Sequence, residues 1–180
     1  MIDLVGKLTL RAFNLIESRL SVVLFHRVLA APDPLLPDEP DISRFADQVR
    51  WLKRCFRILP LRQALGLLAE GRLPAGAVCI TFDDGYLDNY AHALPVLRQL
   101  EAPATFFVTT RHLEGGMMWN DRVIEAVRHW SGPVIDPGAH GVPATPLSND
   151  RAGVANQLLG QLKYLPYAER DALADELFAR

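Results

Sequence analysis

The chain has 180 residues, of which 49% are hydrophobic and 22% charged, and its formal net charge at pH 7 is -2. A near-neutral chain of this length can bury a sizeable core, so we predict a single globular domain over residues 1–180. Nucleic-acid-binding domains normally carry a basic stripe, whereas charges of both signs are mixed along this chain, so we expect no nucleic-acid partner. Cys55 and Cys79 form no CxxC motif, and Cys79 is expected to be a buried hydrophobe rather than half of a disulfide.

The N-terminal stretch is apolar, but five charged residues interrupt it before position 20. No uninterrupted span reaches the roughly 18 apolar residues needed to cross a bilayer, and no secretion signal is visible. Apolar residues at helical spacing between Ile2 and Ile16 predict an amphipathic helix, packed on the domain or, alternatively, lying on a membrane surface. We therefore expect a cytoplasmic or membrane-peripheral location.

The first half of the chain alternates between strand and helix patterns. Short runs rich in β-branched, aromatic or other apolar residues predict strands at Leu20–Phe25, Arg57–Leu59 and Ala77–Phe82. Ser43 is a candidate N-cap for a helix through Phe45, Val49 and Leu52, and a second helix is expected over Leu61–Glu70, before Gly71. The proline-containing and acidic stretch Ala30–Pro40 must be a loop.

The second half continues the alternation and then becomes helical. Asp88 can cap a helix that runs to about Leu100, with Pro95 as a kink or its first turn. The run Ala104–Thr109 predicts a strand that is apolar on both faces, like Ala77–Phe82. The remaining predicted elements are a helix over Trp119–Trp130, a loop over Ser131–Pro146 and helices over about Asn149–Leu162 and Tyr167–Arg180.

Strands that are apolar on both faces and alternate with helices indicate an α/β domain with a parallel sheet, open or closed into a barrel. The sheet has only three or four recognisable strands, and the last helical pattern meets no residue that terminates it. We therefore expect the chain to be the N-terminal part of a longer protein.

Polar residues follow three of the predicted strands. They are His26, the pair Asp83 and Asp84, and the pair Arg111 and His112. The carboxyl ends of parallel strands meet at one edge of a sheet, where ligands bind, so these groups are expected to lie near one another. Adjacent carboxylates on an extended segment point in different directions, which allows one to bind a metal and the other to act as a base. Gly85 then allows a tight turn.

From His26 to about Glu125 the chain resembles the polysaccharide deacetylase family, also called the NodB-homology or carbohydrate esterase family 4 domain. The resemblance rests on three motifs in order: TFDDGY (Thr81–Tyr86), ALPVL (Ala93–Leu97) and PATFFV (Pro103–Val108). The segment FHRV around His26 and the Trp-Asn-Asp at Trp119–Asp121 are also similar to family members.

The resemblance implies a distorted (β/α) barrel, incomplete in this chain, and an enzyme that removes acetyl groups from N-acetylated sugars of a polysaccharide. It implies a divalent metal, usually zinc, with Asp84 as a metal ligand and Asp83 as the general base that takes a proton from water. His26, Tyr86, Trp119 and Asp121 are carried over as candidate substrate-pocket residues.

The family's second metal motif, His-Ser/Thr-x-x-His, is absent, since no two of the five histidines are four residues apart. Zinc needs at least three protein ligands, so we expect an incomplete ligand set and a chain that can be inactive alone. One alternative is a non-catalytic glycan-binding or scaffold remnant in exopolysaccharide biosynthesis. A phosphotransferase fits poorly, because that chemistry usually has Asp-x-Asp after the strand.

Several side chains have both a functional and a structural interpretation. His26, Asp84 and His112 form a possible substitute metal site, against the simpler expectation that His112 lies on the surface. Trp119 is either a platform for a sugar ring or a half-buried packing residue. His92 and His129 fall in predicted helices and are expected to be solvated or capping, and nothing near His140 offers it a partner.

Overall fold

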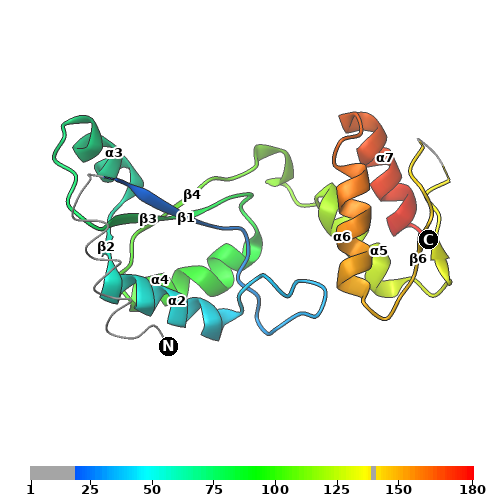
Figure 1. Cartoon of the computed structure of the whole chain (residues 1–180), viewed down its shortest axis with the longest axis horizontal. Helices are drawn as coiled ribbons and strands as arrows, with labels where there is room; N and C mark the ends of the chain where they lie inside the picture. Colours follow the sequence, from blue (N-terminus) through cyan, green and yellow to red (C-terminus); the bar gives the residue numbers. More distant parts are fainter. Residues whose placement is uncertain (1–18, 139–140) are drawn as a thin grey trace. The chain divides into compact units, whose positions relative to one another are not determined.

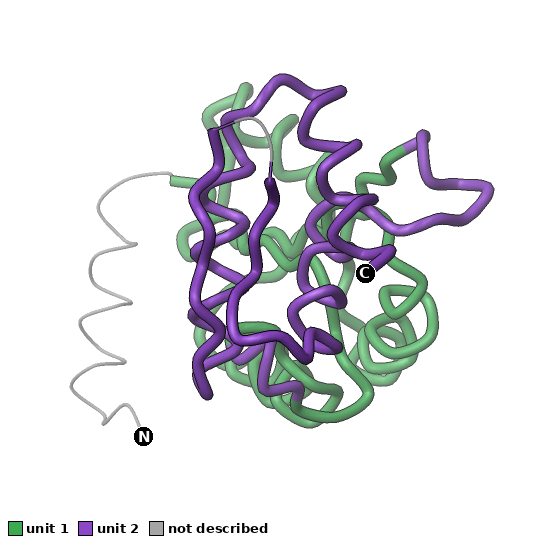
Figure 2. The backbone as a smooth tube through the Cα atoms, turned by 90° about the vertical axis from the view of Figure 1, so that its right-hand side faces the viewer, with its two compact units in different colours: residues 1–32, 38–109 green, residues 33–37, 110–180 purple. Residues whose placement is uncertain are grey.

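The computed structural model describes residues 19–138 and 141–180 (Figure 1). The helix predicted between Ile2 and Ile16, and His140, lie outside the described residues. The chain forms two compact units, shown in Figure 2. The first, here called the sheet unit, contains the residues up to Pro32 and Asp38–Thr109. The second, called the helical unit, contains Asp33–Pro37 and Thr110–Arg180.

The sheet unit is built on four parallel strands, which confirms the predicted α/β class. β3 (Ala77–Phe82) lies at the centre and pairs with β1 (Ser21–Phe25) on one side. On its other side β3 pairs first with β2 (Arg57–Ile58) and then with β4 (Ala104–Phe106). The sheet is open among the described residues, so closure into a barrel stays a prediction, as does the single domain.

The burial of the strands follows their position in the sheet. Every residue of β3 is buried, as its apolar sequence predicts for a central strand covered on both faces. β1 pairs only with β3 among the described strands, and Val22 and Leu24 are each about half exposed. The strand predicted over Ala104–Thr109 is shorter and less buried than expected, since Phe107 and Val108 lie beyond β4 and are 50% exposed.

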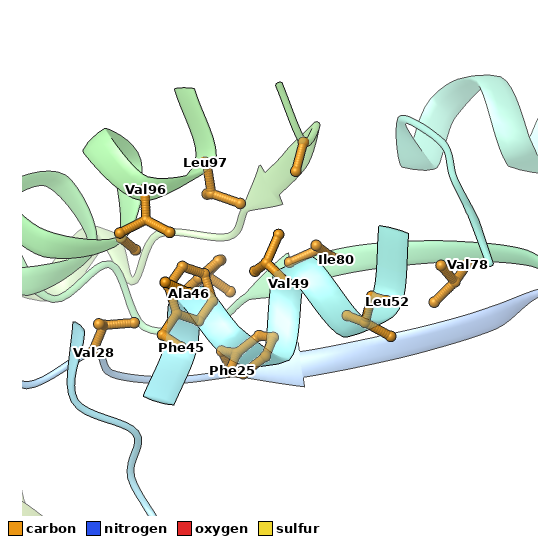
Figure 3. Close-up of a cluster of buried hydrophobic side chains, with 13 residues drawn as sticks. Phe25, Val28, Phe45, Ala46, Val49, Leu52, Val78, Ile80, Val96 and Leu97 are labelled. Carbon is orange, nitrogen blue, oxygen red and sulfur yellow. The ribbon is translucent and has the colours of Figure 1, made fainter. Parts of the chain in front are cut away.

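The main core of the sheet unit lies between the sheet and helices α2 (Ile42–Cys55) and α4 (Leu94–Gln99), as Figure 3 shows. Side chains alternate along a strand, so Val78, Ile80 and Phe82 of β3 point to this face. Within this largely aliphatic core, four phenylalanine rings form a connected cluster. Phe82 is stacked with Phe106 at 4.7 Å between ring centroids, and Phe25 and Phe45 also pack against it. The opposite face of β3 packs Ala77 and Cys79 with Ala64 of α3 (Leu61–Ala69).

Helix α2 begins two positions earlier than the sequence indicated. Asp41, and not Ser43, is the N-cap, and its side chain accepts a hydrogen bond from the Arg44 backbone N–H at 2.8 Å. The prediction of Ser43 was wrong because both residues are good caps and only Asp41 has the extended backbone that a cap requires, with ψ at 175°.

The segment after β3 is also different from its prediction. Residues Asn89–Ala93 form a π-helix that continues into α4, with Pro95 in the first turn of α4. Asp88 precedes the π-helix but its side chain makes no capping hydrogen bond, so its predicted role as a cap is wrong. Its carboxylate is instead bonded to the segment after β1.

The helical unit contains α5 (Trp119–His129), α6 (Arg151–Leu162) and α7 (Tyr167–Phe178), which lie side by side in Figure 1. A short 3-10 helix, Thr110–His112, precedes them. Their common core consists mainly of aliphatic side chains and alanines from the three helices. The stretch predicted as a loop contains a small antiparallel pair, β5 (Val134–Ile135) and β6 (Thr145–Pro146).

Charged side chains add a second set of contacts to the helical unit. Arg128 makes two hydrogen bonds to the carboxylate of Asp33, the shorter at 2.6 Å, and Arg122 pairs with Asp171 and Asp175. The pKa of Arg128 is raised, first by its hydrogen bond to Asp33 and further by Glu125, against the opposing effect of burial. In the part of the chain that the structure describes, no helix has both the length and the apolar character to cross a membrane.

Candidate functional site

The two aspartates of the TFDDGY motif form a tight turn directly after β3. The backbone N–H of Asp83 donates to the Phe25 carbonyl at 3.0 Å, which joins the start of the turn to the end of β1. Asp84 and Gly85 then have φ values of 72° and 75°, both in the left-handed region. Gly85 therefore turns the chain as predicted. The expectation that both aspartates lie on an extended segment is wrong, because Asp84 already has a left-handed backbone conformation.

The segment after β4 explains why residue 85 is a glycine. A Cβ at this position would lie 2.7 Å from Cγ1 of Val108, closer than real Cβ atoms come to a neighbour, and 3.2 Å from its Cα, which is also a tight contact. The Thr109 N–H also donates to the Asp84 carbonyl at 3.2 Å. The turn is therefore held between the ends of β1 and β4, and its backbone comes too close to Val108 for a side chain.

The carboxylates of this turn are available for a ligand as far as the described residues are concerned. Asp83 and Asp84 are both half-buried, and neither side chain has a hydrogen bond or ion pair with another described residue. A half-buried carboxylate without a partner keeps its lone pairs available for a proton or for a ligand. The turn thus presents two available acceptors at the carboxyl end of a central strand, where α/β proteins bind their ligands.

His26 is exposed and lies beside a groove of about 480 Å³ in the sheet unit. The groove is lined by Val23–His26, by Asp38–Pro40 and by Gln48, Trp51 and Leu52 of α2, and by neither aspartate of the turn. Burial raises the pKa of Glu39 in this groove, while the charges of His26 and Arg27 and a hydrogen bond from the Arg27 backbone N–H oppose that shift.

The structure adds two residues that sequence reasoning missed. Arg27 donates from Nε to Oδ2 of Asp88 at 2.9 Å, and its guanidinium lies over the Tyr86 ring, 4.5 Å from the centroid. Asp88 is only 9% exposed, so this is a carboxylate paired inside the protein. No local pattern identifies the pair, because its members are 61 residues apart in sequence.

The other predicted site residues belong to the helical unit. Trp119 is half-buried, and the guanidinium of Arg170 lies 4.7 Å from the centre of its ring, so at least one face is already covered. Asp121 lies in the first turn of α5 and is half-buried. His112 is half-buried at the end of the 3-10 helix, not fully on the surface as expected.

The described residues do not by themselves fit a zinc ion. Structural and catalytic zinc sites use at least three protein ligands. Within residues 19–138 and 141–180, no group of three or more His, Cys, Asp or Glu side chains is placed to hold a metal. Within the sheet unit Asp84 is therefore not part of a three-ligand group, and the substitute site of His26, Asp84 and His112, whose last member belongs to the other unit, stays a prediction.

A parallel α/β unit with unpartnered carboxylates at the end of its central strand belongs to the broad class of α/β enzymes and ligand-binding domains. Comparison with known proteins narrows this class. Residues 70–145 match the family model described as polysaccharide deacetylase, so the predicted resemblance to that family is confirmed for this segment. The match includes Asp83, Asp84, Tyr86, Trp119 and Asp121 and does not reach His26.

A curated protein with a similar sequence is also named as a deacetylase. Poly-beta-1,6-N-acetyl-D-glucosamine N-deacetylase of Staphylococcus aureus (strain MSSA476) is 36% identical over 72 residues, which cover 39% of this chain and 25% of the relative. The chain thus spans about a quarter of the length of the curated relatives it matches first.

Two solved structures are similar over larger parts of the chain. The structure of IcaB from Ammonifex degensii has a TM-score of 0.46 and 23% identity, covering 88% of this chain and 80% of that one. The Streptococcus pyogenes deacetylase PplD in complex with acetate has a TM-score of 0.45 and 21% identity, covering 58% and 50%.

Proposed function

We propose that the chain is part of an enzyme that removes acetyl groups from N-acetylated sugars of a polysaccharide. The observation that carries the proposal is the turn Asp83-Asp84-Gly85, which lies inside the segment matched by the deacetylase family model. The name of the Staphylococcus aureus relative supports a polymer of N-acetylglucosamine as the substrate class.

In this proposal Asp83 is the general base. Its carboxylate takes a proton from a water molecule whose oxygen attacks the acetyl carbonyl carbon, and the resulting tetrahedral intermediate breaks its C–N bond. The sugar nitrogen takes up a proton and leaves as an amine, and the other product is acetate. Removing a general base of this kind typically lowers the rate by about 10²–10⁴-fold.

The proposal keeps Asp84 as a ligand for a divalent metal, with zinc as the first candidate. The other ligands would have to come from groups that the described residues do not assemble. We therefore expect the chain tested alone to bind zinc weakly, which competition with a chelating dye measures. Asp84→Ala should remove the binding that remains, and Asp47→Asn, an exposed carboxylate change on α2, should leave it unchanged.

A second candidate function is binding of the glycan without catalysis, as a scaffold in exopolysaccharide assembly. The observation that favours this candidate is that the described residues assemble no group of three metal ligands, since a lone carboxylate is a poor metal site. Two further predictions accompany both candidate functions. One is a location in the cytoplasm or at a membrane surface. The other is a substrate pocket that includes His26, Tyr86, Trp119 and Asp121.

One assay separates the two candidates. The chain is incubated with β-1,6-linked N-acetylglucosamine oligomers, and acetate release and oligomer binding are measured together, with and without added zinc. Release that is lost in Asp83→Asn and kept in Asp47→Asn supports the deacetylase. Binding without release supports the scaffold, and the absence of both overturns the two proposals for this chain.

A further inference from the structure

The three residues after β1 are fixed to the segment that follows the Asp-Asp turn. Asp88 accepts the Val28 N–H on Oδ1 at 3.3 Å, and Nδ1 of His92 donates to the Val28 carbonyl at 2.7 Å. The Asn89 side chain satisfies its neighbours when its amide nitrogen, and not its oxygen, faces the His26 carbonyl and Asp88 Oδ1. In that orientation it donates to the first at 3.0 Å and to the second at 3.2 Å. Backbone groups of His26–Val28 are therefore held by side chains of Asp88–His92.

His92 is part of this arrangement, contrary to the prediction that it would be solvated or capping. His92 belongs to the π-helix. Its Nδ1 must carry the donated proton, because a carbonyl oxygen can only accept a hydrogen bond. A π-helical turn often occurs at functional positions. Here it places Asn89 and His92 so that both reach the chain after β1.

Arg27 connects this fixed segment to the turn. Its Nε donates to Asp88, and its guanidinium lies over the ring of Tyr86, the residue that directly follows Gly85. A guanidinium bonded to a carboxylate has a fixed plane, and a plane of that kind is suited to stacking on an aromatic ring. The orientation of Tyr86 thus depends on a carboxylate that lies two residues further along the chain.

The turn is consequently supported at three points. Its start is bonded to Phe25 through the Asp83 N–H, its middle to Thr109 through the Asp84 carbonyl, and its end is stacked against Arg27 through Tyr86. The first two supports are backbone hydrogen bonds and do not depend on side-chain identity. The third runs through the side chains of Arg27, Tyr86 and Asp88.

We propose that Asp88 is a positioning residue for the Asp-Asp turn and acts through Arg27 and Tyr86. It does not touch the reacting atoms. By fixing the plane of Arg27 it holds Tyr86 and the end of the turn, and so sets where the Asp83 carboxylate lies. The inference rests on the proposed function for its catalytic consequence, whereas the positioning itself is a property of the folded chain.

The positioning is tested first by NMR of the full chain. The ring of Tyr86 should shift the δ-methylene protons of Arg27 upfield, with Tyr86→Leu as the reference without that ring. In Asp88→Asn we expect these protons to move to the Tyr86→Leu position, together with changes in the amide shifts of Asp83 and Gly85. Arg27→Lys keeps a cation beside Asp88 but lacks the planar group, so it should reproduce the amide changes.

The matched control is Asp33→Asn, which removes the carboxylate of another partly buried arginine–aspartate pair, in the helical unit. It should leave the Arg27 and Gly85 signals unchanged. Arg27 protons that are not shifted upfield in the parent chain, or that stay in place in Asp88→Asn, overturn the inference. The same is true if Asp33→Asn moves the signals as much as Asp88→Asn does.

The kinetic consequence is measured with the oligomer assay. A small displacement of a catalytic group can cost about 10²-fold in rate, so Asp88→Asn should lower kcat by about that factor and leave KM within about twofold. A parent chain without acetate release counts against the proposed function, and the NMR result then decides the positioning. An active parent chain whose kcat is unchanged in Asp88→Asn contradicts the inference and leaves the proposed function intact.

Discussion

The sheet unit and the helical unit bury their side chains in different ways. In the sheet unit a cluster of four phenylalanine rings fills the space between the sheet and its helices, and β3 is bonded to strands on both sides. In the helical unit the core is mainly aliphatic, and arginine–carboxylate pairs join α5 to α7 and to the Asp33–Pro37 segment. The sheet unit therefore combines an aromatic cluster with strand hydrogen bonds, whereas the helical unit combines an aliphatic core with charge pairs between its segments.

The largest expected effect tests the aromatic core of the sheet unit. Phe82 is fully buried and contacts three other rings, so Phe82→Ala should lower the free energy of unfolding by about 3–5 kcal/mol. Urea denaturation followed by circular dichroism measures this change. A loss no larger than that of Val22→Ala, a half-exposed position on β1, would contradict the central role of this cluster.

The second prediction concerns the backbone of the turn. Gly85→Ala combines a left-handed φ with a Cβ that overlaps Val108, so we expect a loss of roughly 2–4 kcal/mol. Gly71→Ala is the matched control, because Gly71 has a φ of 65° and no atom within 4 Å of an added Cβ. It should cost only about 1–2 kcal/mol. Equal losses in the two variants would show that the contact with Val108 is unimportant.

The third prediction tests the charge contacts of the helical unit. Asp33→Asn removes the charge of the carboxylate that accepts two hydrogen bonds from Arg128, which keeps Glu125 as its remaining carboxylate partner, and the side chains of Asp33 and Arg128 are less than a third exposed. We expect a loss of about 1–2 kcal/mol in unfolding free energy that becomes smaller at high salt. Asp47→Asn removes an exposed pair with Arg50 on α2 and should change stability by less than about 0.5 kcal/mol.

The smallest effect is a change in pH dependence at Glu39. Its pKa in the folded chain is raised above its ordinary value of 4.5, mainly by burial. Between these two values the folded chain holds more protons than the unfolded chain, so stability from this group is present at low pH and lost as pH rises. Glu39→Gln cannot ionise, and its stability relative to the parent should increase as the pH rises through and above 4.5. Urea titrations at several pH values check this, and parallel curves for the two proteins would refute it.

Most of the architecture could be predicted because it follows from local patterns. β3 was found because all six of its residues are apolar or small enough to be buried, and α5 because its buried residues recur at helical spacing. The β5–β6 pair was missed because both strands lie in a glycine- and proline-rich stretch whose composition predicts a loop. Asp41 was missed as a cap because sequence alone does not distinguish it from Ser43.

In the candidate site, too, local sequence predicts one part and not the other. Asp83, Asp84 and Gly85 are neighbours in sequence, and their position after an apolar run was enough to identify the turn. The supports of the turn come from Arg27 and Asp88, which are far apart in sequence and meet only because β1 and β3 are parallel neighbours. A contact that depends on strand pairing cannot be recognised from spacing along the chain.

The open side of β1 has a practical consequence for experiments on this chain. Ser21–Phe25 contains no charged residue or proline, its Val22 and Leu24 are half exposed, and among the described strands it pairs only with β3. A strand of this kind is a template on which other chains can aggregate. Concentrated samples for NMR should therefore precipitate more slowly when lysine replaces Val22, a change that keeps the buried face of β1 intact.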